Sequence, residues 1–84
     1  PAMNQEAVFQ LLVSHAREVV PHLAQHPFQP SESFKTLGAN SMDRADILMM
    51  TMEALSIRCS LTELAGPANI GELAALLAQK ARHG

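Results

Sequence analysis

Residues 37–55 read LGANSMDRADILMMTMEAL, and this stretch decides the fold. Gly38 can adopt a positive φ without steric penalty, so the chain can turn sharply there. Asn40 or Ser41 can cap a helix that starts here, because a short side-chain oxygen accepts hydrogen bonds from the free N–H groups of the first turn. Asp43 lies in that turn, where the helix dipole favours negative charge. The stretch therefore predicts a helix that displays the Ser41 hydroxyl at its N-terminus, facing solvent.

Two roles are open to Ser41. Helix N-termini bind phosphoryl groups through free N–H donors and the dipole, so a phosphodiester on the Ser41 hydroxyl would lie near the positive end of the helix. Alternatively, Ser41 is only an N-cap, which is the usual role of a serine before a helix and the one that spacing alone favours. A resemblance to a known family, described below, is needed to choose between the two.

The composition is typical of a small helical domain rather than an enzyme. The 84 residues leave room for one domain but not for an enzyme with a cleft of its own. Hydrophobic residues make up 48% of the chain, and its many Ala, Leu, Met and Glu residues favour helix. Pro1 and Ala2, just before Met3, resemble an expression remnant, so we take residues 3–84 as the single domain.

Charge and cysteine content exclude several other classes of protein. A formal net charge of −2 argues against a nucleic-acid partner, since phosphate binding needs a basic face. Cys59 is the only cysteine, so the chain can form neither an intramolecular disulfide nor a cysteine metal site. The sequence contains no signal peptide and no apolar run long enough to cross a membrane, and we expect a cytoplasmic protein.

Three principal helices and one short helix are expected. They span residues 4–20, 41–56 and 70–82, with the short helical turn at residues 61–64. Pro21 cannot continue the first helix, and Asn69 with Glu72 resembles a capping box at the start of the last one. No stretch sustains the alternation of a strand. The predicted fold class is therefore all-α, a small antiparallel bundle.

Apolar residues at steps of three and four give each expected helix one buried stripe. The stripes comprise Val8, Leu11, Leu12, Ala16 and Val19 in the first helix, Ile47, Leu48, Thr51, Ala54 and Leu55 in the second, and Ile70, Leu73, Leu76, Leu77 and Ala81 in the third. His15 lies at the edge of the first stripe, where we expect a histidine at the border of the core rather than a ligand or a base.

The long connection over residues 22–36 is expected to be irregular because it contains Pro27 and Pro30. Its expected anchors on the core are Leu23, Phe28 and Phe34. His22 and His26 are four residues apart, a spacing that suits a metal pair on a helix, but prolines bound the segment and no third ligand is evident. We therefore expect solvated loop histidines and no metal site.

A second side of the helix over residues 41–56 is apolar and yet must partly face solvent. Met42 and Met49 alternate with charged residues there, so we interpret them as part of a docking surface. Met52 can instead belong to the core. Arg44 is the single basic residue in a helix that otherwise bears acids, and it can either pair with neighbouring carboxylates or influence the choice of partner.

The run LGANSMD at residues 37–43 resembles the attachment motif of acyl carrier proteins, in which Gly, Asp, Ser and Leu follow in that order. Gly38 and Ser41 match, Met42 takes the leucine position, and Asn40 departs from the usual aspartate. The resemblance covers residues 12–81 and implies the carrier fold. It also implies 4′-phosphopantetheine as a phosphodiester on Ser41, attached from CoA by a phosphopantetheinyl transferase, with an acyl group on its terminal thiol. An unmodified helical interaction module is the rival class.

Residues 38–46, GANSMDRAD, are more specifically similar to the discrete donor carriers of polyketide β-branching. This resemblance implies a malonyl cargo, supplied by an acyltransferase, decarboxylated to acetyl by a ketosynthase-like enzyme and used by a hydroxymethylglutaryl-synthase-like enzyme. The synthase would read a surface made of Met42, Asp43, Arg44, Asp46 and Met49. An ordinary discrete carrier of fatty-acid, polyketide or peptide synthesis is the alternative. In either case catalysis would belong to partner enzymes, and we expect a monomer.

Overall fold

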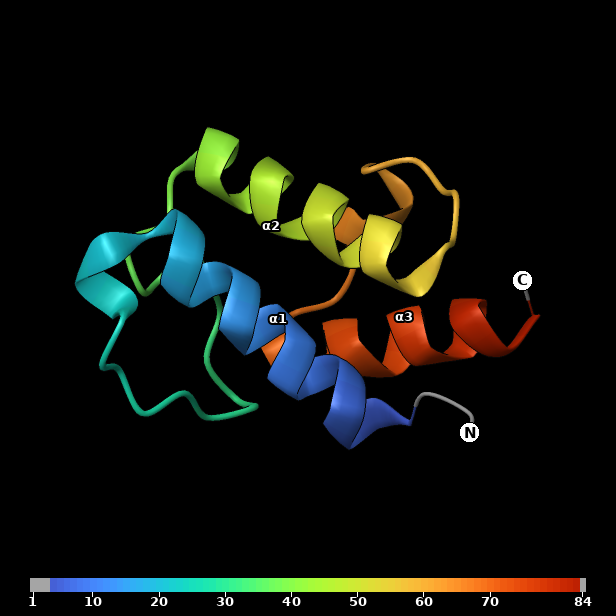
Figure 1. Cartoon of the computed structure of the whole chain (residues 1–84), viewed down its shortest axis with the longest axis horizontal. Helices are drawn as coiled ribbons and strands as arrows, with labels where there is room; N and C mark the ends of the chain where they lie inside the picture. Colours follow the sequence, from blue (N-terminus) through green and yellow to red (C-terminus); the bar gives the residue numbers. More distant parts are fainter. Residues whose placement is uncertain (1–3, 84) are drawn as a thin grey trace.

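The computed structural model describes residues 4–83 and contains only helices and loops in that range. Its elements are α1 (Gln5–Val19), the 3-10 turn η1 (Pro21–Leu23), α2 (Ser41–Leu55), the 3-10 turn η2 (Glu63–Ala65) and α3 (Ile70–His83). In Figure 1, α2 and α3 both run opposite to α1, which contacts each of them. The predicted all-α bundle is confirmed. The expected remnant at residues 1–2 lies outside the described residues.

Helix α1 has the predicted ends but a broader buried face. The Asn4 side chain accepts a hydrogen bond from the backbone N–H of Ala7 at 2.8 Å, and the helix ends at Val19, just before Pro21. Its buried residues are Val8, Phe9, Leu12, Val13 and Ala16, whereas Leu11 and Val19 are only half-buried. The predicted stripe was too narrow because α1 packs against α2 on one side and α3 on the other.

The long connection is fastened to the core at the predicted anchors, since Leu23, Phe28 and Phe34 are all buried. It is also fastened to the start of α3, where the carbonyls of Glu32 and Pro30 accept hydrogen bonds from the N–H groups of Ile70 and Gly71, each at 2.9 Å. A Cβ at Gly71 would lie 2.9 Å from the Pro30 Cβ, so this close approach of loop and helix requires glycine.

The histidines of this connection are less solvated than expected. His26 pairs with Glu32 at 3.0 Å and its ring packs edge-on against Phe28, so it is half-buried. His22 is exposed, but its ring lies 3.1 Å from the Leu37 carbonyl. The two histidines therefore serve separate loop contacts. No group of three His, Cys, Asp or Glu side chains in the described part of the chain is arranged to hold a metal ion.

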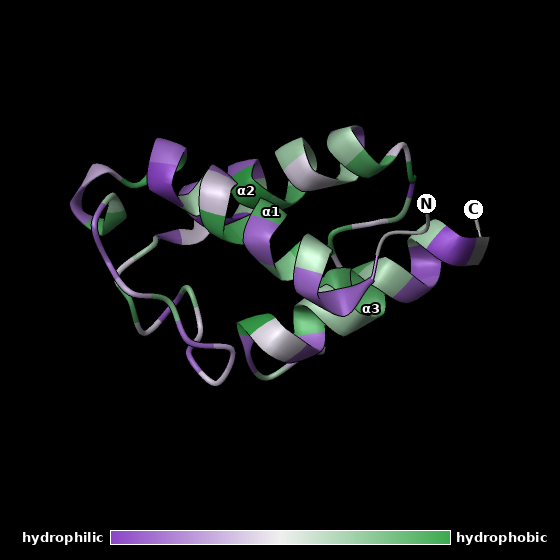
Figure 2. Cartoon of the chain, turned by 60° about the horizontal axis from the view of Figure 1, so that its bottom comes forward, coloured by the Kyte–Doolittle hydropathy of each residue, from purple (hydrophilic) through white to green (hydrophobic). Residues whose placement is uncertain are grey.

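Helix α2 starts at Ser41, as predicted, and ends where Ser56 adopts a left-handed conformation. Only Ile47 and Thr51 are buried in it; Leu48 and Leu55 are half-buried and Ala54 is exposed. The prediction for Ala54 was wrong because α2 packs chiefly against α1, which leaves one flank without a helical neighbour. Figure 2 shows hydrophobic residues over much of the C-terminal half of α2, in contrast to the hydrophilic end of α3.

The segment between α2 and α3 forms its short helix at residues 63–65, which starts two residues and ends one residue later than predicted. The Glu63 carboxylate is 3.1 Å from the Lys80 amine, which joins this segment to α3. Hydrogen bonds from Ser60, above all from its backbone N–H, and then Lys80 lower the pKa of Glu63 below its ordinary value. Segment and helix are therefore tied together at the surface.

Helix α3 begins with a variant of the predicted capping box. Asn69 accepts from the Glu72 N–H at 2.8 Å, but the Glu72 carboxylate accepts from Ala68 rather than from Asn69. The buried face of α3 comprises Ile70, Leu73, Ala74, Leu77 and Ala78, with Leu76 and Ala81 half-buried. In the described range, no helix combines the length and the hydropathy that a membrane span requires.

Candidate functional site

The site is built around Ser41, the first residue of α2. Its neighbour Asn40 is the N-cap: the Asn40 side chain accepts from the Asp43 N–H at 2.8 Å, and the Asp43 carboxylate accepts from the Asn40 N–H at 3.0 Å. This reciprocal pair satisfies donors at the helix start without using the serine. Ser41 is exposed, and its hydroxyl makes no hydrogen bond within residues 4–83. Of the two residues that could cap, the structure uses Asn40 and leaves the Ser41 oxygen available.

The turn before Ser41 depends on Gly38 in two ways. Its φ is +95°, which side chains rarely allow, and a Cβ there would lie 3.0 Å from Nε2 of His22. That nitrogen is 3.1 Å from the Leu37 carbonyl, and because a carbonyl can only accept, Nε2 must carry the proton in this contact. His22 thus supports the turn that positions Ser41, a role that sequence reasoning missed because the contact spans fifteen residues.

Two roles were predicted for Arg44: pairing with neighbouring carboxylates, and an influence on the choice of partner, which stays a prediction. Its Nη1 donates to the carbonyl of Ala39 at 2.7 Å, so the side chain folds back over the turn and is half-buried. The ion pairs of the described side chains join His26 to Glu32 and Lys80 to Glu63, and neither includes Arg44. The alternative of a pair with neighbouring acids is therefore not found among the described side chains, and Arg44 instead fixes the backbone just before the helix.

The predicted recognition residues divide into exposed and partly covered ones. Met42 is 76% exposed and Met49 is 56% exposed, so both apolar side chains of α2 face solvent. Asp46 is also exposed, whereas Asp43 and Arg44 are half-buried and bond to the turn. Met52 packs against the core, its sulfur 3.5 Å from the Cys59 thiol. Of the predicted recognition residues, Met42, Met49 and Asp46 are thus displayed on α2.

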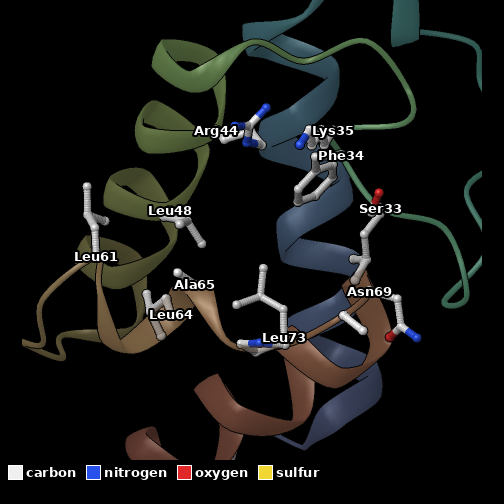
Figure 3. Close-up of a pocket in the computed structure, with 13 residues that line it drawn as sticks. Ser33, Phe34, Lys35, Arg44, Leu48, Leu61, Leu64, Ala65, Asn69 and Leu73 are labelled. Carbon is white, nitrogen blue, oxygen red and sulfur yellow. The ribbon is translucent and has the colours of Figure 1, made fainter.

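A pocket of about 390 Å³ lies beside α2, whose Arg44 and Leu48 line it. Its walls are mostly apolar and come from α2, the segment before α3, the start of α3 and the long loop (Figure 3). Leu48, Leu61, Leu64 and Leu73 line it, and Lys35 and Arg44 are the charged residues of its lining. An accessible hydroxyl at a helix N-terminus with a cationic and apolar pocket beside it fits an anionic, flexible prosthetic group.

Comparison with known proteins agrees with this geometry. The family described as "Phosphopantetheine attachment site" matches residues 10–77, most of the chain. The chain belongs to this family. It is also 42% identical, over 93% of its length and 95% of the relative, to the polyketide biosynthesis acyl-carrier-protein AcpK of Bacillus subtilis.

Among solved structures, the chain resembles the acetyl donor acyl carrier protein crystallised in complex with the HMG synthase of the curacin biosynthetic pathway. The TM-score is 0.87 at 46% identity, and the match covers 93% of this chain and all of that one. The relatives are carriers rather than enzymes, which confirms the prediction of a carrier protein. Covalently attached 4′-phosphopantetheine is accordingly the cofactor of the chain.

Proposed function

We propose that Ser41 carries the 4′-phosphopantetheine and that the loaded chain is the acetyl donor to an HMG-synthase-like enzyme in polyketide biosynthesis. The likeness to the donor carrier of the curacin HMG synthase complex, at 46% identity over that whole chain, is the observation that carries the donor role. The exposed Ser41 hydroxyl at the start of α2, left unused by the cap, supports the attachment. HMG stands for hydroxymethylglutaryl.

In the attachment reaction the chain contributes an oxygen and its surroundings. The Ser41 Oγ forms a bond to the phosphorus of CoA that bears the pantetheine, the pyrophosphate bond breaks, and adenosine 3′,5′-bisphosphate leaves while the hydroxyl proton is lost. No side chain bonds to Ser41 as a base in the described structure, so this proton passes to a group of the phosphopantetheinyl transferase. When bound, the group supplies a terminal thiol that holds the acyl unit as a thioester.

Recognition by the partner enzymes falls to the exposed side of α2. Met42 and Met49 offer flexible apolar contacts, and Asp46 adds a charge between them. Asp43 and Arg44 border this surface and shape it through their bonds to the turn. The proposed partners are the transferase, an acyltransferase that supplies malonyl, a decarboxylating ketosynthase-like enzyme and the HMG-synthase-like enzyme.

A reconstituted reaction tests the donor role. The chain is loaded with acetyl, mixed with an HMG-synthase-like enzyme and a second carrier bearing a β-ketoacyl group, and the mass of the second carrier is followed. We expect the second carrier to gain the acetyl unit at a rate at least tenfold above that seen with a fatty-acid carrier loaded in the same way. Equal rates from the two donors would contradict the donor role and leave a general carrier.

A further inference from the structure

The turn before Ser41 is already closed by its own backbone. It covers residues 37–39, with Gly38 at a φ of +95°. The three N–H groups of the turn donate to carbonyls of the long loop, from Leu37 to Ser33 at 3.1 Å, from Gly38 to Lys35 at 3.1 Å and from Ala39 to Phe34 at 3.0 Å. These bonds satisfy every backbone donor of the turn, so a further contact is not needed to form it.

Two side chains from outside the turn nevertheless hold its carbonyls, one on each side of Gly38. The Nε2 of His22 donates to the Leu37 carbonyl at 3.1 Å, and the Nη1 of Arg44 donates to the Ala39 carbonyl at 2.7 Å. The first comes from η1 and the second from α2. Because the contact of His22 is exposed, water could satisfy the Leu37 carbonyl in its place. The bond from His22 therefore restricts the turn, and burial does not demand it.

His22 ties the turn to a part of the chain outside α2. Arg44 belongs to α2 itself, so its bond joins that helix to the backbone just before its own N-terminus. His22 lies instead directly after α1, fifteen residues before Leu37. Its ring also packs on the glycine, because a Cβ at Gly38 would lie 3.0 Å from Nε2 and 3.3 Å from Cε1. His22 thus fixes, relative to α1, the backbone that leads into Ser41.

We propose that His22 is a positioning residue for the attachment reaction: by holding the turn, it sets where the Ser41 Oγ lies when CoA approaches. The inference rests on the proposed attachment to Ser41. In that reaction Oγ bonds to phosphorus as the pyrophosphate bond of CoA breaks, and an in-line displacement at phosphorus requires the attacking oxygen to be closely placed. Ser41 follows Gly38 by only three positions, so a displacement of the turn is passed directly to Oγ.

Steady-state kinetics of loading test this role. The transferase and CoA are supplied, the concentration of the carrier is varied, and the gain in mass gives kcat and the KM for the carrier. In His22→Ala we expect kcat to fall about threefold or more, since one hydrogen bond and a close placement are lost. KM should stay within about twofold of wild type, because the exposed Met42, Asp46 and Met49 are unchanged.

Two further variants isolate the hydrogen bond. Gln extends an N–H to the position of Nε2, so His22→Gln should recover most of the rate, whereas the side chain of Asn is one bond shorter and His22→Asn should not. Gln25, exposed in the same connection, supplies the control Gln25→Ala, for which kcat and KM should match wild type. His22 is exposed, so the variants should fold, which circular dichroism checks. If His22→Ala does not fold, the comparison of His22→Gln with His22→Asn decides in its place.

Three results would overturn the proposal: a kcat of His22→Ala equal to that of wild type, an equal loss of kcat in His22→Ala and His22→Gln, or a raised KM with an unchanged kcat. The last would indicate a purely structural role, since a fraction of unfolded carrier lowers its effective concentration and not the rate at saturation. The proposed attachment fails in a different way, because then wild type itself gains no mass.

Discussion

The residues around Ser41 stabilise the start of α2, and Ser41 itself takes no part in the cap. Asn40 and Asp43 exchange hydrogen bonds, Gly38 turns the chain at φ +95°, and Arg44 fixes the Ala39 carbonyl. Because these neighbours supply the local contacts, the serine oxygen is exposed and does not serve as the cap.

Asn40→Ala should destabilise the fold without blocking loading. The substitution removes the oxygen that accepts from the Asp43 N–H, and loss of an N-cap costs about 1 kcal/mol. Asn40→Asp keeps an acceptor and is the matched control, for which we expect a change below about 0.5 kcal/mol. Urea unfolding followed by circular dichroism measures both. Equal stability of Asn40→Ala and wild type would mean that the cap contributes nothing.

Gly38→Ala should cost at least about 1 kcal/mol, because its φ is +95° and the added Cβ would lie 3.0 Å from the His22 ring. Gly66 offers a contrast: its φ is −70° and nothing lies within 4 Å of an added Cβ. Gly66→Ala should therefore be neutral or stabilise by up to about 1 kcal/mol. The same unfolding measurement compares the two alanine variants, and a larger loss at Gly66 would contradict this account of the turn.

The residues of the site were predictable to the extent that local patterns encode them. The run from Gly38 to Met42 marks a turn, a cap and a displayed serine, and the structure has all three. The contacts of His22 with Leu37 and of Arg44 with Ala39 depend on how the loop folds back, so spacing alone could not predict them. For Arg44, the sequence showed only a positive charge three positions after the serine, which does not indicate a bond to the Ala39 carbonyl.

Among the elements, α2 carries the candidate site, and it is only partly covered. It packs chiefly on α1, and its other flanks meet solvent and the pocket. Helix ends were predicted well, since capping side chains and Pro21 act locally. Buried faces were predicted less well: Ala54 is exposed and Phe9 is buried, because the neighbours of a helix, and not its own periodicity, decide how wide its covered sector is.

Replacing the exposed methionines should impair partner recognition and leave the fold intact. Met42 and Met49 are 76% and 56% exposed, so Met42→Gln with Met49→Gln should change the free energy of unfolding by less than about 0.5 kcal/mol. Transfer to the synthase should fall at least tenfold if these side chains form the centre of the contact. The exposed Ala75 on α3 provides the control Ala75→Gln. Undiminished transfer by the double variant would remove both methionines from the recognition surface.

The tie between η2 and α3 should weaken in acid. Bonds from Ser60 and then Lys80 lower the pKa of Glu63, so the ionised form is favoured in the folded chain. This stabilisation is present above the pKa of the unfolded carboxyl, about 4.3, and is lost as the pH falls through the lower folded value. Glu63→Gln should therefore lower the melting temperature slightly at pH 7 and have no effect well below pH 4. The exposed Glu53 gives the control Glu53→Gln; a Glu63→Gln difference that persists in strong acid would contradict the assignment.

At the scale of the whole molecule, the fold places the Ser41 hydroxyl, the exposed methionines Met42 and Met49 and one wall of the pocket on the same helix, α2. Helix α1 lies between α2 and α3 and holds α2 through the bond from the His15 ring to the buried Thr51 hydroxyl at 2.7 Å. The long loop holds the N-terminus of α3, because the carbonyls of Pro30 and Glu32 accept hydrogen bonds from the first N–H groups of that helix. A carrier needs this arrangement, since its partners act on the group that it holds and not on the fold.

The mass of the intact protein tests the central claim most directly. The chain is incubated with CoA and a broad-specificity phosphopantetheinyl transferase, beside Ser41→Ala and a control, Ser31→Ala, in which another exposed serine is removed. We expect wild type and Ser31→Ala each to gain the mass of one phosphopantetheinyl group and Ser41→Ala to gain nothing. No gain in wild type, or a gain that persists in Ser41→Ala, would contradict the account.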